Sequence, residues 1–115
     1  MIYFREISCN NDTGYCDGQD GRQFKGAFVR HLGYAATSPL FGNKQTIEIW
    51  LKQQVDSILT HASLSLTLDS GLPGLLLGQL WQGPSPIDGD DDMPWIGHGS
   101  AMDALCAYLL VIDRQ

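Results

Sequence analysis

The chain has 115 residues, which is the size of one domain with a small core. Hydrophobic residues make up 43% of it and charged residues only 17%, so the composition is that of a globular protein and excludes an intrinsically disordered one. The formal net charge of −6 disfavours nucleic acids and anionic membranes as partners, because both are bound through an excess of Lys and Arg.

A short hydrophilic loop near the start of the chain is bracketed by Cys9 and Cys16. A disulfide between them would order a segment that has little to bury, whereas two reduced surface thiols are the alternative. Asn11 begins an Asn-Asp-Thr triplet, which is an N-glycosylation signal. Both features favour a secretory route, although the first residues form no apolar signal sequence and we expect no membrane-spanning segment.

Two amphipathic helices are predicted next. The first covers residues 23–37, with a buried face that repeats every three or four positions: Phe24, Phe28, Leu32 and Ala35. Lys25 and Arg30 lie five residues apart in it and therefore on different faces. The second follows Asn43 as N-cap, and its apolar face consists of Ile47, Trp50, Leu51, Val55, Ile58 and Leu59.

The middle of the chain is predicted to be mostly loop. The alternation of serine or threonine with leucine over 63–68 is typical of a short strand, and the leucines at 75–77 indicate either a buried turn or a second strand. A long polar connection rich in glycine, proline and aspartate then covers 83–95. Its three consecutive aspartates, 90–92, lack the glycine and glutamate positions of a calcium loop and indicate a solvated acidic turn.

A last helix is predicted from Ser100 to Ile112, after a flexible entry loop over 97–99. Ser100 and Asp103 have the spacing of a capping box, and Cys106 lies within an apolar run, which indicates a buried free thiol. Histidines 31, 61 and 98 are too far apart in sequence to suggest a metal site, so we expect neither metal nor cofactor.

The order of these motifs resembles a known enzyme family. Cys9 and Cys16, followed by Asp-Gly-x-x-Phe-Lys-Gly-x-Phe-x-Arg over 20–30, are similar to the C-terminal half of glycoside hydrolase family 76, the endo-α-1,6-mannanases and related cell-wall transglycosidases. The Gly-x-x-Trp element that ends at Trp81 and the segment 97–105 extend the resemblance over nearly the whole chain. No residues match the family's catalytic aspartate pair, which lies upstream of this stretch.

The resemblance implies an all-α fold in which three to four helices with long loops form part of an (α/α)6 toroid. It implies that residues 1–115 are the C-terminal portion of a secreted or cell-wall-associated, mannan-active domain, whose upstream part supplies the carboxylates that hydrolysis requires. Trp81 and Trp95 are candidates to stack on a sugar ring, and Lys25 and Arg30 to reach a hydroxyl. Packing and structural ion pairs are the alternative roles for these four residues, and a noncatalytic carbohydrate-binding module is the alternative function.

Overall fold

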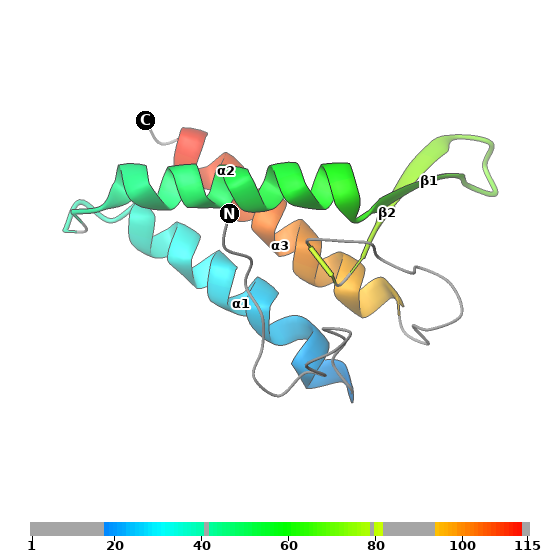
Figure 1. Cartoon of the computed structure of the whole chain (residues 1–115), viewed down its shortest axis with the longest axis horizontal. Coiled ribbons are helices and arrows are strands. Elements are labelled where there is room, and N and C mark those ends of the chain that lie inside the picture. Colours follow the sequence, from blue (N-terminus) through cyan, green and yellow to red (C-terminus); the bar gives the residue numbers. More distant parts are fainter. Residues whose placement is uncertain (1–17, 41, 79, 82–93, 114–115) are drawn as a thin grey trace.

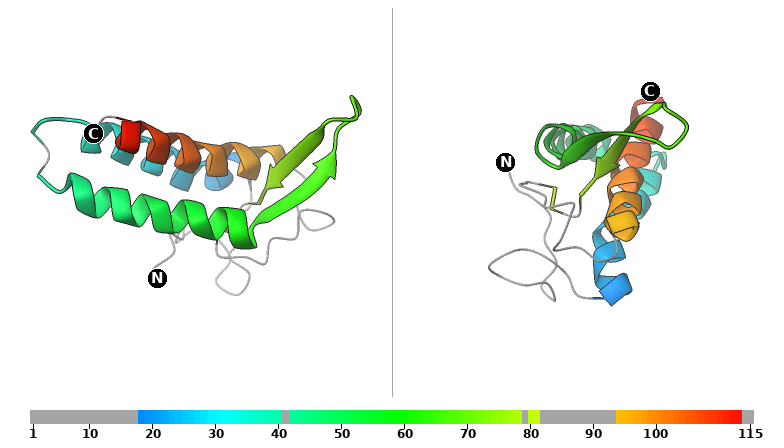
Figure 2. Two further views of the ribbon diagram at one scale, coloured as in Figure 1. Left: turned by 90° about the horizontal axis from the view of Figure 1, so that it is seen from above. Right: turned by 90° about the vertical axis from the view of Figure 1, so that its right-hand side faces the viewer.

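The computed structural model describes residues 18–40, 42–78, 80–81 and 94–113. In this part, helix α1 (Gly18–Ala36) and helix α2 (Lys44–His61) precede a hairpin of strand β1 (Ser63–Thr67) and strand β2 (Pro73–Leu77), and helix α3 (Pro94–Asp113) follows. The three helices lie side by side and the hairpin projects beyond one end of them (Figures 1 and 2). Of the predicted all-α fold, the predominance of helix is confirmed for the described residues, and a two-stranded sheet is added to it.

Helices α1 and α3 run parallel and form the closest contact in the molecule. Gly26 of α1 faces Ser100 of α3, and Gly33 faces Ala107. Each second residue lies two helical turns after the first on its own helix, so the two helices run in the same direction. A Cβ atom on Gly26 would lie 2.6 Å from the Cα of Ser100, which is far inside normal contact distance. The absence of a side chain at Gly26 therefore allows the two backbones to touch.

The buried face of α1 differs from the predicted one. Phe24 and Phe28 are each about half exposed, at 51% and 49%, whereas Val29 and Ala36 are buried. Bulky rings cannot enter a contact as close as the one between α1 and α3, so the small residues occupy it. The prediction that Phe24 and Phe28 face the core was wrong, although Leu32 does pack against it.

Helix α2 lies antiparallel to the other two and completes the core (Figure 2). Its predicted apolar face is largely confirmed: Ile47, Leu51, Val55 and Ile58 are buried and Trp50 is packed against the cluster. Asn43 holds the N-cap position, but its side chain makes no capping hydrogen bond. The core cluster joins all three helices and the end of β2 through Val29, Leu51, Ile58, Leu77, Trp81 and Val111.

The segment predicted as mostly loop contains the antiparallel hairpin. Ser63 pairs with Leu77 and Thr67 with Pro73, and Gly71 has a φ of 84°, which few other residues adopt, in the connecting turn. The backbone N–H of Gly78 donates to the carbonyl oxygen of Ala62 at 2.7 Å and closes the base of the hairpin against the end of α2.

Helix α3 begins earlier than predicted. It starts at Pro94, so the residues assigned to an entry loop are helical and Ser100 lies within the helix instead of capping it. Proline is favoured in the first turn, where its missing N–H has no partner to lose. Cys106 is exposed, so the predicted buried thiol is also wrong.

By length and composition alone, α3 could cross a membrane. The segment from Trp95 to Asp113 is long and apolar enough, contrary to the expectation that no such segment exists, but core helices of soluble proteins have the same character. In this structure Ala101, Ala104 and Ala107 of α3 are buried in the core. We therefore describe α3 as the central helix of the bundle.

Candidate functional site

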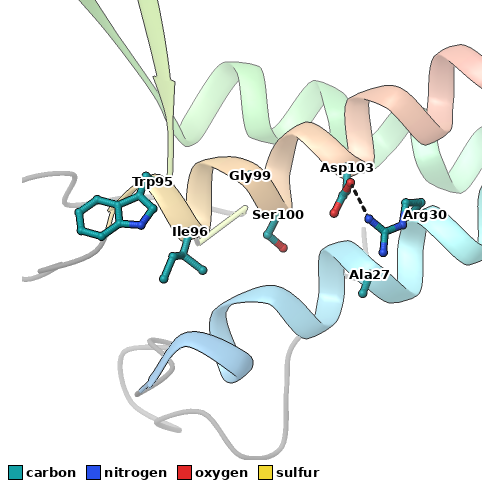
Figure 3. Close-up of a pocket in the computed structure, with 7 residues that line it drawn as sticks. All are labelled: Ala27, Arg30, Trp95, Ile96, Gly99, Ser100 and Asp103. Atoms are coloured by element: carbon teal, nitrogen blue, oxygen red, sulfur yellow. Dashed lines mark ion pairs between the residues drawn. The ribbon is translucent and has the colours of Figure 1, made fainter.

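An open cleft of about 420 Å³ lies between the middle of α1 and the first half of α3. Seven residues line it, and all are drawn in Figure 3: Ala27, Arg30, Trp95, Ile96, Gly99, Ser100 and Asp103. The two residues from α1 are one helical turn apart and the five from α3 follow a three-and-four spacing. The parallel packing of the two helices therefore builds the cleft directly from their facing edges.

Trp95 marks one end of this cleft. It lies in the first turn of α3 with 64% of its surface exposed, and Figure 3 shows its indole at the opposite end from Arg30 and Asp103. The flat face of an exposed indole is well suited to stacking on a ligand ring. Of the tryptophans in the described part of the chain, Trp95 is the most exposed.

An ion pair marks the other end. The Arg30 Nη1 atom lies 3.5 Å from the Asp103 Oδ1 atom, and both side chains are partly exposed, at 45% and 30%. This separation is longer than the roughly 2.7–2.9 Å of a charge-assisted hydrogen bond. The guanidinium donors and the carboxylate acceptors therefore keep hydrogen-bonding capacity for a ligand.

Ser100 lies between these two ends. It is only 3% exposed, and its hydroxyl oxygen has no hydrogen-bond partner in the structure. This oxygen is the nearest atom to the position that a Cβ on Gly26 would take, so it lies buried in the contact between α1 and α3 and not at the open surface of the cleft. The cleft thus combines an aromatic face at one end with a donor and an acceptor at the other.

Two other predicted residues lie elsewhere. Trp81 is completely buried, so its ring cannot stack on a sugar in this structure. The Lys25 ammonium lies 4.6 Å from the centroid of that ring, in a cation–π arrangement, and Lys25 itself is 7% exposed. The Ser57 hydroxyl donates to the Trp81 carbonyl oxygen at 2.7 Å, which fixes this residue against α2.

Sequence reasoning found Arg30 and Trp95 but missed Asp103 and Ser100 as residues of the cleft. Both had been assigned to a helix cap, because the start of α3 was placed too late. Once the helix begins at Pro94, the positions 96, 99, 100 and 103 fall on one face by their spacing. A correct helix start would have placed these positions on one face of α3, although not against α1.

The remaining predicted features fall outside the described residues. These are the Cys9–Cys16 disulfide, the glycosylation site at Asn11 and the acidic run 90–92. Within the described ranges, no three His, Cys, Asp or Glu side chains gather as metal ligands.

Among the residues that line the cleft, Asp103 is the one carboxylate. Glycoside hydrolysis requires two carboxyl groups on either side of the scissile bond, and the described lining of the cleft supplies one of them. No protein-family model, no curated protein and no solved structure matches the chain.

Proposed function

We propose that this chain is the carbohydrate-binding, C-terminal portion of a secreted or cell-wall mannan-active protein similar to glycoside hydrolase family 76. The cleft between α1 and α3 would bind a neutral polysaccharide such as α-1,6-mannan. The observation that carries the proposal is the exposed Trp95 indole in one cleft with the Arg30–Asp103 pair. Sugar sites commonly combine an aromatic face for the ring with polar groups for the hydroxyls.

In this proposal the complete protein hydrolyses or transfers α-1,6-mannosidic linkages with an upstream aspartate pair, and its helices continue the ring of an (α/α)6 toroid. The resemblance of the segment from Cys9 to Arg30 supports this reading. Several large apolar side chains on the described surface would be covered by further helices: Phe24, Phe28, Met102 and Leu109 are each at least 40% exposed. Transglycosylation is compatible with the same pair of carboxylates.

A noncatalytic binding module is the second candidate. It is favoured by the core that the described residues form among themselves, in which Val29, Leu51, Ile58 and Val111 are fully buried. Both candidates predict binding by this chain without turnover. They differ in the size of the native protein, which a blot with an antibody to residues 44–62 measures after deglycosylation. A band several-fold above 12.7 kDa supports the enzyme portion, and a band at 12.7 kDa supports the module.

Affinity electrophoresis of the chain in gels containing α-1,6-mannan tests the shared proposal. We expect the wild type to be retarded and Trp95→Ala to migrate as in a mannan-free gel, because stacking of a sugar on an exposed ring contributes a large share of such binding. Leu72→Ala removes an equally exposed apolar side chain from the hairpin and is the matched control, which should stay retarded. Equal migration of the wild type with and without mannan would refute the proposal.

A further inference from the structure

Two ion pairs on the described surface of this protein differ in a way that bears on the cleft. Lys52 and Asp56 on α2 are in direct contact, with 2.6 Å between the ammonium nitrogen and the carboxylate oxygen. The Arg30 Nη1 and Asp103 Oδ1 atoms are separated by 3.5 Å, which is longer than a charge-assisted hydrogen bond. These two charges are close enough to neutralise each other, and both side chains are partly exposed, so a ligand can reach them.

From this geometry we propose that Asp103 sets the ligand specificity of the cleft: together with Arg30 it selects an uncharged saccharide that presents two adjacent hydroxyl groups and rejects an anionic one. This inference rests on the proposed carbohydrate function and assigns a role to a residue that the sequence analysis did not include. It concerns recognition only, and no bond is made or broken.

Arg30 and Asp103 make complementary hydrogen bonds to a sugar. The Arg30 guanidinium can only donate, so it binds the oxygen of one hydroxyl, and the ionised Asp103 carboxylate can only accept, so it binds the hydrogen of the neighbouring hydroxyl. Adjacent hydroxyls on a pyranose ring present such a donor and acceptor side by side.

Charge explains the rejection of anionic sugars. A lone arginine would bind a sugar carboxylate in a bidentate manner. Here Asp103 neutralises the guanidinium and repels a second carboxylate, and the net charge of −6 adds a weaker, screened repulsion. The ion pair therefore weakens the binding of anionic sugars in the cleft and preserves the binding of neutral hydroxyl groups.

The test compares methyl α-D-mannopyranoside with methyl α-D-mannopyranosiduronate, which differ only in a CH₂OH group against a carboxylate. Binding to the full chain is measured by NMR titration in 0.15 M salt. We expect the wild type to prefer the neutral glycoside by about tenfold, and Asp103→Asn to bind the neutral glycoside less well and the uronate about tenfold better than the wild type does. Asp56→Asn removes the same unit of negative charge away from the cleft and should change neither affinity.

The outcomes separate the two proposals. If the wild type binds both glycosides equally and Asp103→Asn alters neither affinity, the specificity inference is overturned while the carbohydrate function stands. If the wild type binds neither glycoside and no mannan, both are overturned. If Asp103→Asn and Asp56→Asn improve uronate binding equally, overall charge and not Asp103 sets the selectivity, which also overturns the inference.

Discussion

The contact between Gly26 and Ser100 allows a quantitative test of the helix packing. In Gly26→Ala the new Cβ would lie 2.6 Å from the Cα and 2.7 Å from the carbonyl oxygen of Ser100. Both are backbone atoms, so no side-chain rotation relieves the clash. The two helices would have to separate by roughly 1 Å, and overpacking of this kind costs about 1–3 kcal/mol.

Glycine-to-alanine changes at two other positions allow the stability loss in Gly26→Ala to be compared within the same protein. Gly33→Ala brings a Cβ to 2.9 Å from the Cβ of Ala107, a milder contact with a side-chain atom, so we expect a smaller loss of stability. Gly99→Ala meets nothing within 4 Å and lies within α3, where alanine is favoured over glycine by about 0.5–1 kcal/mol. The expected order of unfolding free energy is Gly99→Ala, wild type, Gly33→Ala and, lowest, Gly26→Ala.

Equilibrium urea unfolding followed by circular dichroism at 222 nm measures these differences. The double variant Gly26→Ala/Ser100→Ala is an informative control, since removal of the hydroxyl leaves the backbone contacts in place and should not restore stability. Stabilisation of the protein by Gly26→Ala, to the same extent as by Gly99→Ala, would mean that α1 and α3 are not in backbone contact.

Two further predictions concern single hydrogen bonds. The Leu77 N–H donates to the His98 Nδ1 at 2.9 Å, so His98→Ala should leave a buried donor unpaired, at a cost of about 1–3 kcal/mol. We expect faster hydrogen exchange of the Leu77 amide in His98→Ala, whereas His98→Asn can keep an acceptor there. Unchanged exchange in His98→Ala would contradict this prediction. The pKa of Lys52 is raised above its ordinary 10.5, first by its hydrogen bond to Asp56 and then by attraction to that carboxylate. Its stabilising effect is therefore complete below the unfolded-state pKa and is lost as pH rises through the folded-state pKa, and NMR titration should find a lower Lys52 pKa in Asp56→Asn than in the wild type.

The helices could be predicted from sequence because apolar spacing is a local signal. Helix α2 shows this best, since Ile47, Leu51, Val55 and Ile58 are buried as their period indicates. Helix α1 was predicted over 23–37 and is found over Gly18–Ala36, so its end was close but its start was placed five residues too late, and its buried face was wrong. Hydrophobicity selects Phe24 and Phe28 for the core, whereas the distance between α1 and α3 admits only small residues, and that distance is a tertiary property.

Residues in irregular segments were harder to place. Trp81 follows a short run of leucines and precedes a Gly-Pro pair, which suggested an exposed loop residue, yet it is completely buried. Its burial depends on Lys25 and Ser57, which are distant in sequence and contact its ring and its carbonyl oxygen. No local pattern contains that information.

Of the residues that mark the two ends of the cleft, only some could be predicted, because their contacts also join segments distant in sequence. Chemical type identified Trp95 and Arg30 as candidates, because aromatic and cationic side chains are common in sugar sites. Asp103 could be paired with Arg30 only once the parallel register of α1 and α3 was known.

The parallel arrangement of α1 and α3 also constrains how the protein is made. Helix α1 is synthesised before α3, but the surface that covers its glycines belongs to α3, so its main partner leaves the ribosome only after α2 and the hairpin. A helix of this composition gains little stability alone, because helix nucleation is costly and glycine is a poor helix former. Helix α2 and the hairpin are built from contacts between neighbouring residues, so both can form before α3 is available to pack on α1. We therefore expect α1 to become stable only after α3 has been synthesised, and truncation within α3 to leave α1 unfolded.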